Sequence, residues 1–220
     1  EQLFGQNLFA IKLFEFAKNK NTAFNEFGVN RKNGTEYDYY KSAGCDDDLA
    51  WASGWLYLAT QNEDYKNYLK GNCPTPSSGW DTMCWNQVKI GAAILNGEIN
   101  GEWSKAESWL SSQCNDNNYY YVDGWGSARY NCGAQLAALV YAKRKSNDNY
   151  KYWAINQMKY ILGGQPISGS ESMCYVVGFD PDSSIPNNVH HRAASGTDSA
   201  KADADNIPNA NKIIGALIGG

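Results

Sequence analysis

The chain has 220 residues, of which 43% are hydrophobic and only 19% charged, which is typical of a globular protein and excludes intrinsic disorder. Nineteen Lys and Arg against 23 Asp and Glu give a net charge of −4, so the broad basic surface that nucleic acid requires is missing. The longest apolar run, Ile213–Ile218, is far shorter than the roughly 20 residues that cross a bilayer. We therefore predict a soluble protein of one large or two small domains, with neither nucleic acid nor a membrane as partner.

The predicted elements are helices. The first covers Leu3–Phe16, where apolar residues recur at helical spacing, and an Asn-rich loop follows it. Three segments that are apolar nearly all round are predicted to be buried helices: Leu49–Thr60, Val88–Leu95 and Leu136–Ala142. Two amphipathic segments, Ser104–Ser112 and Tyr150–Leu162, are expected to lie outside them. Because convincing strand-forming runs are missing, the pattern predicts an all-α fold with two concentric helical layers.

Loops with polar and aromatic residues precede the buried helices: Asp46–Asp48, Ser78–Asp81 and Asp123–Ser127. If those helices run parallel, the loops meet on one face and could form a cleft. A longer segment, Gly163–Asn211, consists mostly of Gly, Pro, Ser, Asn and Asp. A loop of that length in a compact domain is more often functional than idle.

Aromatic residues are unusually frequent, with 8 Trp and 15 Tyr. Their rings present an apolar face and a polar edge, which complement the C–H face and hydroxyl rim of a sugar. Packing and interface roles explain most single positions equally well. Only the excess as a whole points to carbohydrate.

The six cysteines have no C-x-x-C spacing and there are only two histidines, so a zinc site is not expected. We predict disulfides in an oxidising compartment instead. Of the 15 connectivities that six cysteines allow, the sequence selects none, although Cys73 with Cys84 and Cys114 with Cys132 each flank a loop. The sequon at Asn33 agrees with N-glycosylation and secretion.

Five segments together carry a family resemblance. They are Leu49–Thr60 with the preceding aspartates, Gly124–Tyr130, Tyr160–Pro166, Tyr175–Phe179 leading to Val189–Arg192, and Gly215–Gly220. In order and approximate spacing they resemble the inverting cellulases of glycoside hydrolase family 9. The resemblance implies an (α/α)6 barrel that cleaves β-1,4-glucan, with 1–220 forming part of a single catalytic domain truncated at both ends. About half of the twelve barrel helices would be present.

The resemblance also implies site residues. His190 and Arg192 would hold hydroxyls of the sugar at the cleavage point, and Tyr39 would reach the same subsite. Trp125 and Trp80 would stack on neighbouring rings of the glucan or cello-oligosaccharide. Arg129, in contrast, is expected to brace the cleft loops through hydrogen bonds rather than to bind substrate.

No cofactor is required, but the family resemblance implies a structural calcium ion. Asp47 and Asp48 match the acidic pair of that site, with the Ala43 and Gly44 carbonyls nearby. The alternative is that these carboxylates cap a helix start without metal. Cys174, Asp180 and Asp182 stand where the family has other residues, so the front of the cleft is expected to be reshaped.

The two catalytic carboxylates of the family have no counterpart here. An inverting enzyme needs a base and an acid about 6.5 to 9.5 Å apart. In the family, the base lies upstream of the first helix and the acid downstream of the final Gly-Gly, so the isolated chain is expected to be inactive. Three alternatives remain open. The chain could be part of a secreted endoglucanase, completed by the rest of the same domain. It could instead be a non-catalytic carbohydrate-binding protein, or a structural protein of an extracellular, homo-oligomeric assembly.

Overall fold

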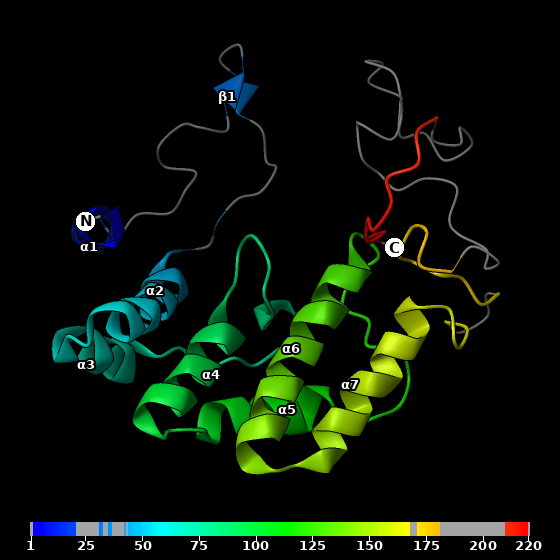
Figure 1. The fold of residues 1–220 in the computed structure, drawn as a ribbon. Helices are drawn as coiled ribbons and strands as arrows, with labels where there is room; N and C mark the ends of the chain where they lie inside the picture. The colour runs from blue at the N-terminus through cyan, green and yellow to red at the C-terminus, as the bar shows by residue number, and fades with distance from the viewer. Residues whose placement is uncertain are drawn as a thin grey trace. The chain divides into compact units, whose positions relative to one another are not determined.

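The computed structural model describes residues 2–20, 31–32, 35–36, 42, 44–167, 171–180 and 210–219 (Figure 1). The chain divides into two compact units, Glu1–Gln113 and Cys114–Gly220. In the described part, no helix is both long and apolar enough to cross a bilayer.

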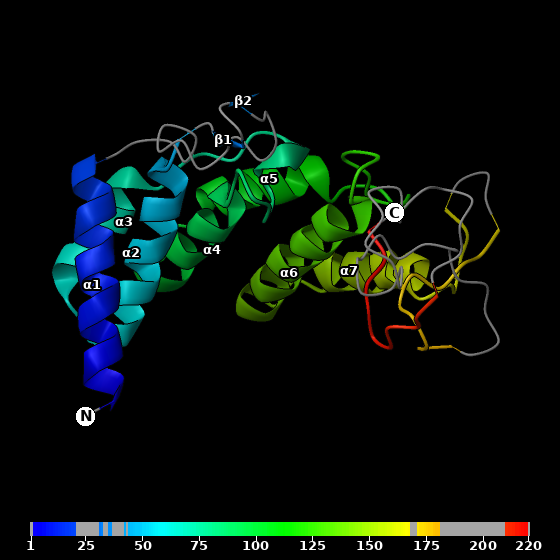
Figure 2. The same ribbon diagram turned by 90° about the horizontal axis from the view of Figure 1, so that it is seen from above.

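The first unit is built from helices that pack against their neighbours in sequence. Its elements are α1 (Gln2–Lys20), β1 (Arg31–Lys32), β2 (Thr35–Glu36), α2 (Asp46–Thr60), α3 (Glu63–Asn72), the 3-10 helix η2 (Gly79–Asp81), α4 (Lys89–Asn100) and α5 (Ser104–Gln113). The two short strands pair antiparallel. Helix α2 lies beside α1, α3 and α4, and α5 lies beside α4 (Figure 2).

Two contacts fix the packing around α2. The Phe14 ring of α1 meets the rings of Tyr65 and Tyr68 edge-on, with each pair of centroids 5.4 Å apart. On another side of α2, a Cβ at Gly54 would lie only 2.9 Å from the Leu95 side chain. The glycine therefore permits the close approach of α2 and α4, because any larger residue would push Leu95 away.

The second unit centres on the helical hairpin of α6 (Ser127–Lys145) and α7 (Asp148–Ile161). Ser146 adopts a left-handed conformation at the end of α6, and the Asn147 side chain then caps the first turn of α7. Such a cap satisfies a helix N–H that has no partner within the helix. Basic residues Lys143, Arg144 and Lys145 occupy the last turn of α6, where they complement the helix dipole.

The predicted helices are confirmed. Four of the expected segments lie within α1, α2, α5 and α6. The other two match α4 and α7, and each extends one residue beyond its helix. Helices α5 and α7 bury one side only, with Trp109 and Trp153 buried and Tyr152 and Ile155 exposed, as their amphipathic patterns predict. Helix α3 was not predicted, because it is a polar helix that buries only Tyr65 and Leu69.

The prediction that a helix is buried on all sides is wrong for α2 and α6. In α2, Trp55 and Leu58 are 52% and 46% exposed, and in α6 Leu136 and Leu139 are 57% and 42% exposed. Their opposite faces are buried, but no described residue covers these side chains fully. Helix α4 fits the prediction better, because the run Ala92–Gly97 is entirely buried.

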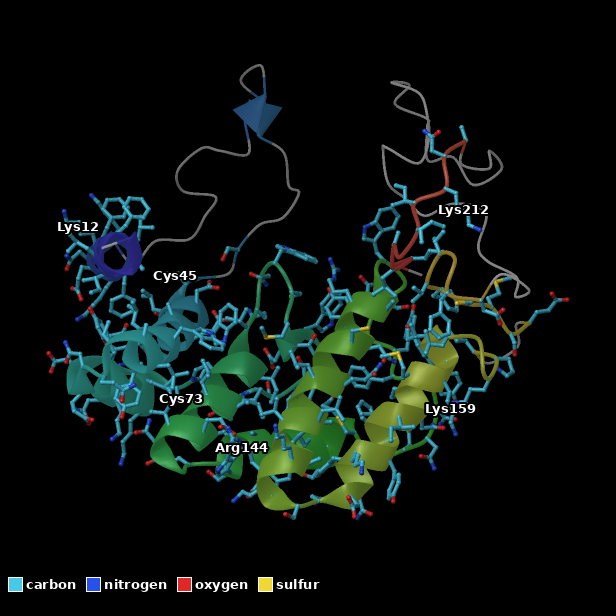
Figure 3. The ribbon with its side chains drawn as sticks, viewed as in Figure 1. Lys12, Cys45, Cys73, Arg144, Lys159 and Lys212 are labelled. Atoms are coloured by element: carbon cyan, nitrogen blue, oxygen red, sulfur yellow. The ribbon has the colours of Figure 1, made fainter. Side chains whose placement is uncertain are left out.

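The predicted disulfides are not seen: all six cysteines lie within the described residues, and no two of them are joined. Disulfide formation therefore stays a prediction. Local backbone geometry directs the sulfurs to nearby carbonyls: the Cys174 thiol donates to the Val176 carbonyl at 3.3 Å and the Cys84 thiol to that of Trp80 at 3.9 Å. Cys45 and Cys73 lie apart in Figure 3. Burial raises the pKa of the Cys114 thiol, which keeps it protonated and unreactive.

Candidate functional site

Three segments that are distant in sequence meet at the start of α6. Backbone hydrogen bonds pair Tyr175–Val177 with Ala216–Ile218, and the Ala128 amide donates to the Gly219 carbonyl at 3.0 Å. The Tyr175 amide also donates to the Ile161 carbonyl, at the end of α7. The segments that flank residues 181–209 are therefore fixed to each other and to the hairpin.

Trp125 stands exposed at this end of the hairpin, with 64% of its surface accessible. Gly126 follows it with a φ of 74°, a left-handed conformation that few residues other than glycine adopt without strain. Arg129 donates to the Trp125 carbonyl at 3.4 Å and to the Tyr130 hydroxyl at 3.2 Å. Its guanidinium also lies 4.7 Å from the centre of the Tyr130 ring. This half-buried arginine connects the loop to α6.

A buried side-chain amide holds the loop that leads to Trp125. Gln157 of α7 is fully buried, and it donates to the Asn118 carbonyl at 2.7 Å while accepting from the Tyr120 amide at 2.8 Å. Asn131 of α6 donates to the same Gln157 oxygen at 2.9 Å and in turn accepts from Gln135 at 2.6 Å. The side chain thus satisfies loop backbone groups as a neighbouring strand would.

The loop also ends in a polar contact. The Tyr119 hydroxyl lies 3.1 Å from the Ser127 hydroxyl at the first residue of α6. Burial raises the pKa of Tyr119 to about 12, so the phenol stays neutral and available as a hydrogen-bond donor.

In the first unit, Trp80 lies in η2 and is 46% exposed. Asp81 beside it is buried and accepts from the Ser77 and Ser78 amides at 2.7 and 2.9 Å. Its second oxygen pairs with the Lys89 ammonium at 2.8 Å. Burial alone would raise the pKa of Asp81, but these hydrogen bonds and the Lys89 charge lower it below its usual value. Asp81 therefore fixes the turn that presents Trp80.

Asp47 and Asp48 lie in the first turn of α2. Asp47 is buried and accepts from the Val88 amide at 2.6 Å, so it caps the start of α4 rather than that of its own helix. Burial and the neighbouring Asp47 charge raise the pKa of Asp48 to about 6. The Gly44 carbonyl, which accepts from Ser42, precedes them.

These donors fit calcium in kind, because carboxylate and carbonyl oxygens are its preferred ligands. They do not complete a site: among the described residues, no cluster of three or more acidic, His or Cys side chains could hold a metal ion. Ala43, the other expected ligand, lies outside the described residues.

The remaining predicted site residues, Tyr39, His190 and Arg192, also lie outside the described residues, as does the glycosylation site Asn33. The structure describes Trp80 in one unit and Trp125 in the other, each exposed.

Gln157 and Asp81 position their loops, and neither role was predicted from the sequence. A signal for Gln157 existed, since it lies four residues after Trp153 and four before Ile161, on the buried side of α7. A polar residue in such a position must find internal partners. Asp81 follows Ser78 at the spacing of a capping box.

The chain belongs to glycosyl hydrolase family 9, whose family model matches residues 8–220. It is 32% identical to Endoglucanase A of Bacillus pumilus over 208 residues, which cover 83% of this chain and 30% of that protein. It is 27% identical to Endoglucanase 24 of Oryza sativa subsp. japonica, of which it covers 43%.

Solved structures of this family also match the chain. The catalytic domain of Clostridium thermocellum CelT matches with a TM-score of 0.73 at 32% identity, covering 94% of this chain and 46% of that one. The endoglucanase CelQ of the same organism, solved with cellobiose and cellotriose, matches with a TM-score of 0.74 at 27% identity, covering 95% of this chain and 37% of that one. The all-α, (α/α)6-barrel fold class is thereby confirmed. This chain spans less than half the length of each of these relatives.

Proposed function

We propose that the chain is part of the catalytic domain of an inverting endoglucanase that hydrolyses β-1,4-glucan, and that both units belong to that one domain. The observation that carries the proposal is the family match over residues 8–220. Solved relatives with bound cello-oligosaccharides support glucan as the ligand.

The role of the second unit in this proposal is to bind sugar. Trp125 offers an exposed apolar ring on a loop that Arg129 and Gln157 hold in place. Stacking on such a ring suits the C–H face of a pyranose. His190 and Arg192 are assigned to the same subsite by the family resemblance. Trp80 and Tyr39 are proposed to contact further sugar rings.

The chemical step requires two carboxyl groups, a base that activates water and an acid that protonates the leaving oxygen. No residue of this chain matches either group of the family. We propose that the rest of the catalytic domain supplies both, and that the isolated 220-residue chain binds but does not hydrolyse glucan. Secretion, and glycosylation at Asn33, belong to the same proposal.

We also propose that Asp47, Asp48 and the Gly44 carbonyl contribute to a structural calcium site. The family resemblance supports this, together with the adjacent carboxylate and carbonyl oxygens at the start of α2, which are of the kind that calcium prefers. A cation there would supply the missing positive charge and fix the start of α2.

The test combines calorimetry with cellohexaose and a reducing-sugar assay on the isolated chain. We expect binding without turnover, and weaker binding by roughly 1 to 3 kcal/mol for Trp125→Ala. Tyr121→Ala is the control, because Tyr121 is equally exposed, at 63%, and has no assigned role. Binding that is indifferent to the Trp125 change contradicts the assignment of Trp125, and robust turnover contradicts the placement of the catalytic carboxylates elsewhere.

A non-catalytic role in binding or assembly is the alternative. An intact mass near 24.4 kDa for the native material would favour it, because an endoglucanase needs the rest of the domain.

A further inference from the structure

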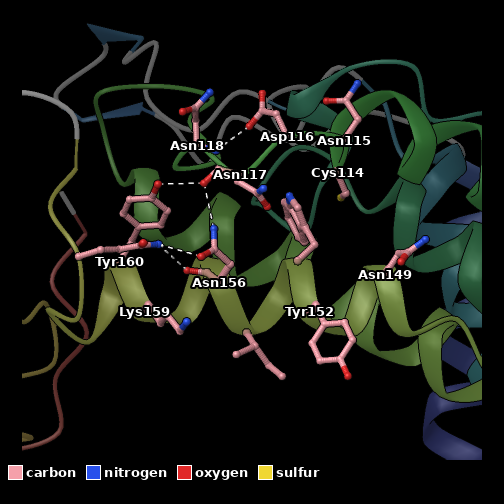
Figure 4. Close-up of a pocket in the computed structure, with 13 residues that line it drawn as sticks. Cys114, Asn115, Asp116, Asn117, Asn118, Asn149, Tyr152, Asn156, Lys159 and Tyr160 are labelled. Carbon is pink, nitrogen blue, oxygen red and sulfur yellow. Dashed lines mark hydrogen bonds between the residues drawn. The ribbon is translucent and has the colours of Figure 1, made fainter.

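A groove of about 790 Å³ follows α7 in the second unit, with one wall formed by residues 114–118 (Figure 4). Its size falls within the range of roughly 300 to 1,000 Å³ that is typical of ligand sites. Trp125 is not among the residues that line it. The groove is therefore a feature separate from the surface that carries Trp125.

Hydrogen bonds hold the walls of the groove in place. The Asn117 carbonyl accepts from Asn156 and from the Tyr160 hydroxyl, both at 2.9 Å (Figure 4). Gln165 donates to the Asn156 carbonyl at 3.0 Å, which closes the end of the groove beyond α7. Because two of these bonds tie Asn117 to α7 and the third ties Gln165 to the same helix, the groove is formed before any ligand arrives.

The lining is rich in side-chain amides, each of which can donate and accept hydrogen bonds. Six amide residues line the groove: Asn115, Asn117, Asn118, Asn149, Asn156 and Gln165. A sugar hydroxyl also donates and accepts, so a row of amides suits a polyhydroxylated ligand better than one that only accepts.

The aromatic surface and the charge of the lining also favour a neutral sugar as the ligand. Tyr152 also lines the groove and is 62% exposed, and in Figure 4 it extends from α7 on the side away from Asn115–Asn118. Its ring offers an apolar face for a pyranose. Asp116 and Lys159 contribute one charge of each sign, so the lining has no net charge to attract a polyanion.

We propose that this groove is a second binding site for a neutral oligosaccharide, used for cello-oligosaccharide segments that lie outside the catalytic cleft. The identity of the sugar rests on the proposed function, whereas the location and the preference for neutral polyhydroxylated ligands rest on the groove itself. Such a site would hold a glucan chain against the surface of the enzyme at a second point.

The experiment is an NMR titration of the full 220-residue chain with cellohexaose, following backbone and side-chain amides. We expect the side-chain amides of Asn149 and Asn156 to shift, and Tyr152→Ala to weaken binding at the groove roughly tenfold. Tyr152→Phe keeps the ring and should retain most of the affinity. Met158→Ala is the matched control, because Met158 is an exposed α7 residue outside the lining. Its affinity should equal that of the wild type, and unfolding midpoints check that all variants are folded.

The outcomes separate this inference from the proposed function. If cellohexaose shifts only resonances around Trp125, and Tyr152→Ala binds as Met158→Ala does, the second site is overturned while the cleft stands. If it shifts the groove amides but none around Trp125, the second site stands and the cleft assignment falls. If it shifts neither, both are overturned.

Discussion

Replacing Gln157 by Met tests whether one buried amide fixes the loop that leads to Trp125. Methionine has a similar length and volume, so it fills the same space without creating a cavity. It removes the donor to the Asn118 carbonyl and the acceptor of the Tyr120 and Asn131 N–H groups. The substitution therefore separates hydrogen bonding from packing.

The cost follows from which partners water can reach. Asn131 is fully buried, and the Tyr120 amide belongs to a half-buried residue, whereas Asn118 is exposed. A buried polar group left without a partner costs about 1 to 3 kcal/mol, and a group that water can reach costs much less. Asn131 keeps its second hydrogen bond, to the Tyr120 carbonyl at 3.3 Å. We therefore expect Gln157→Met to lower the free energy of unfolding by about 2 to 4 kcal/mol, a large fraction of the stability of a domain.

Urea unfolding followed by far-UV circular dichroism measures this loss, and an unchanged m-value would show that the same surface is exposed on unfolding. Asn156→Ala is the control, because it removes a similar amide contact to the same loop, at Asn117, where water can replace it. Its cost should stay below about 1 kcal/mol. In Gln157→Glu, which keeps the acceptor, the Tyr120 amide should exchange more slowly than in Gln157→Met. Equal stability of Gln157→Met and the wild type would refute the reasoning.

Three further predictions concern other parts of the chain. Asp81→Asn should destabilise the protein by about 2 to 4 kcal/mol at neutral pH, because it breaks the contact with Lys89. Since the pKa of Asp81 is lowered on folding, its contribution is present above the unfolded value and disappears as pH falls through the lower folded pKa, so the wild-type and variant stability curves should converge in acid. Gly163→Ala should lower the free energy of unfolding by about 2 kcal/mol, because φ is 81° and the new Cβ would lie 3.1 Å from the Cys174 amide nitrogen. Gly164→Ala is the control. Its new Cβ would have no contact closer than 3.5 Å, so it should lower the stability much less in the same urea assay. Calcium should raise the melting temperature of the wild type, by the equivalent of about 2.7 kcal/mol at a hundredfold excess over its dissociation constant. Asp48→Asn should abolish this shift. Calorimetric scans that coincide with calcium and with chelator would contradict the calcium proposal.

Helical periodicity was sufficient to predict most of the fold, because a helix that buries one face repeats apolar residues every three or four positions. It failed for α3, whose buried residues are only Tyr65 and Leu69 in an otherwise polar stretch. The disulfide prediction rests on a count of cysteines, which carries no information on where the sulfurs point. In the structure, Cys174 directs its sulfur to the Val176 carbonyl.

The candidate site was predictable only in part. Motif resemblance predicted that Trp80 and Trp125 stack on sugar rings, and this role stays a prediction, although both side chains are exposed. The groove along α7 was not predictable, because its lining comes from a loop and a helix that lie more than thirty positions apart and meet through hydrogen bonds such as that from Asn156 to Asn117. Asparagines in a loop and on an exposed helix face look like ordinary solvated residues until the two are brought together.

Helices α2 and α6 each expose one face, although their apolar sequences predicted burial on all sides. Apolar residues occur all round both helices, yet Trp55 and Leu58 in one, and Leu136 and Leu139 in the other, remain accessible. Each such side chain is about half exposed, so it forgoes about half of the roughly 1.5 to 3 kcal/mol that full burial would contribute. A surface helix under no other constraint would be expected to carry polar residues there. The pattern therefore favours further covering of both helices, as expected if more of the family's barrel packs against them, and it agrees with a chain that spans under half of the solved catalytic domain it resembles.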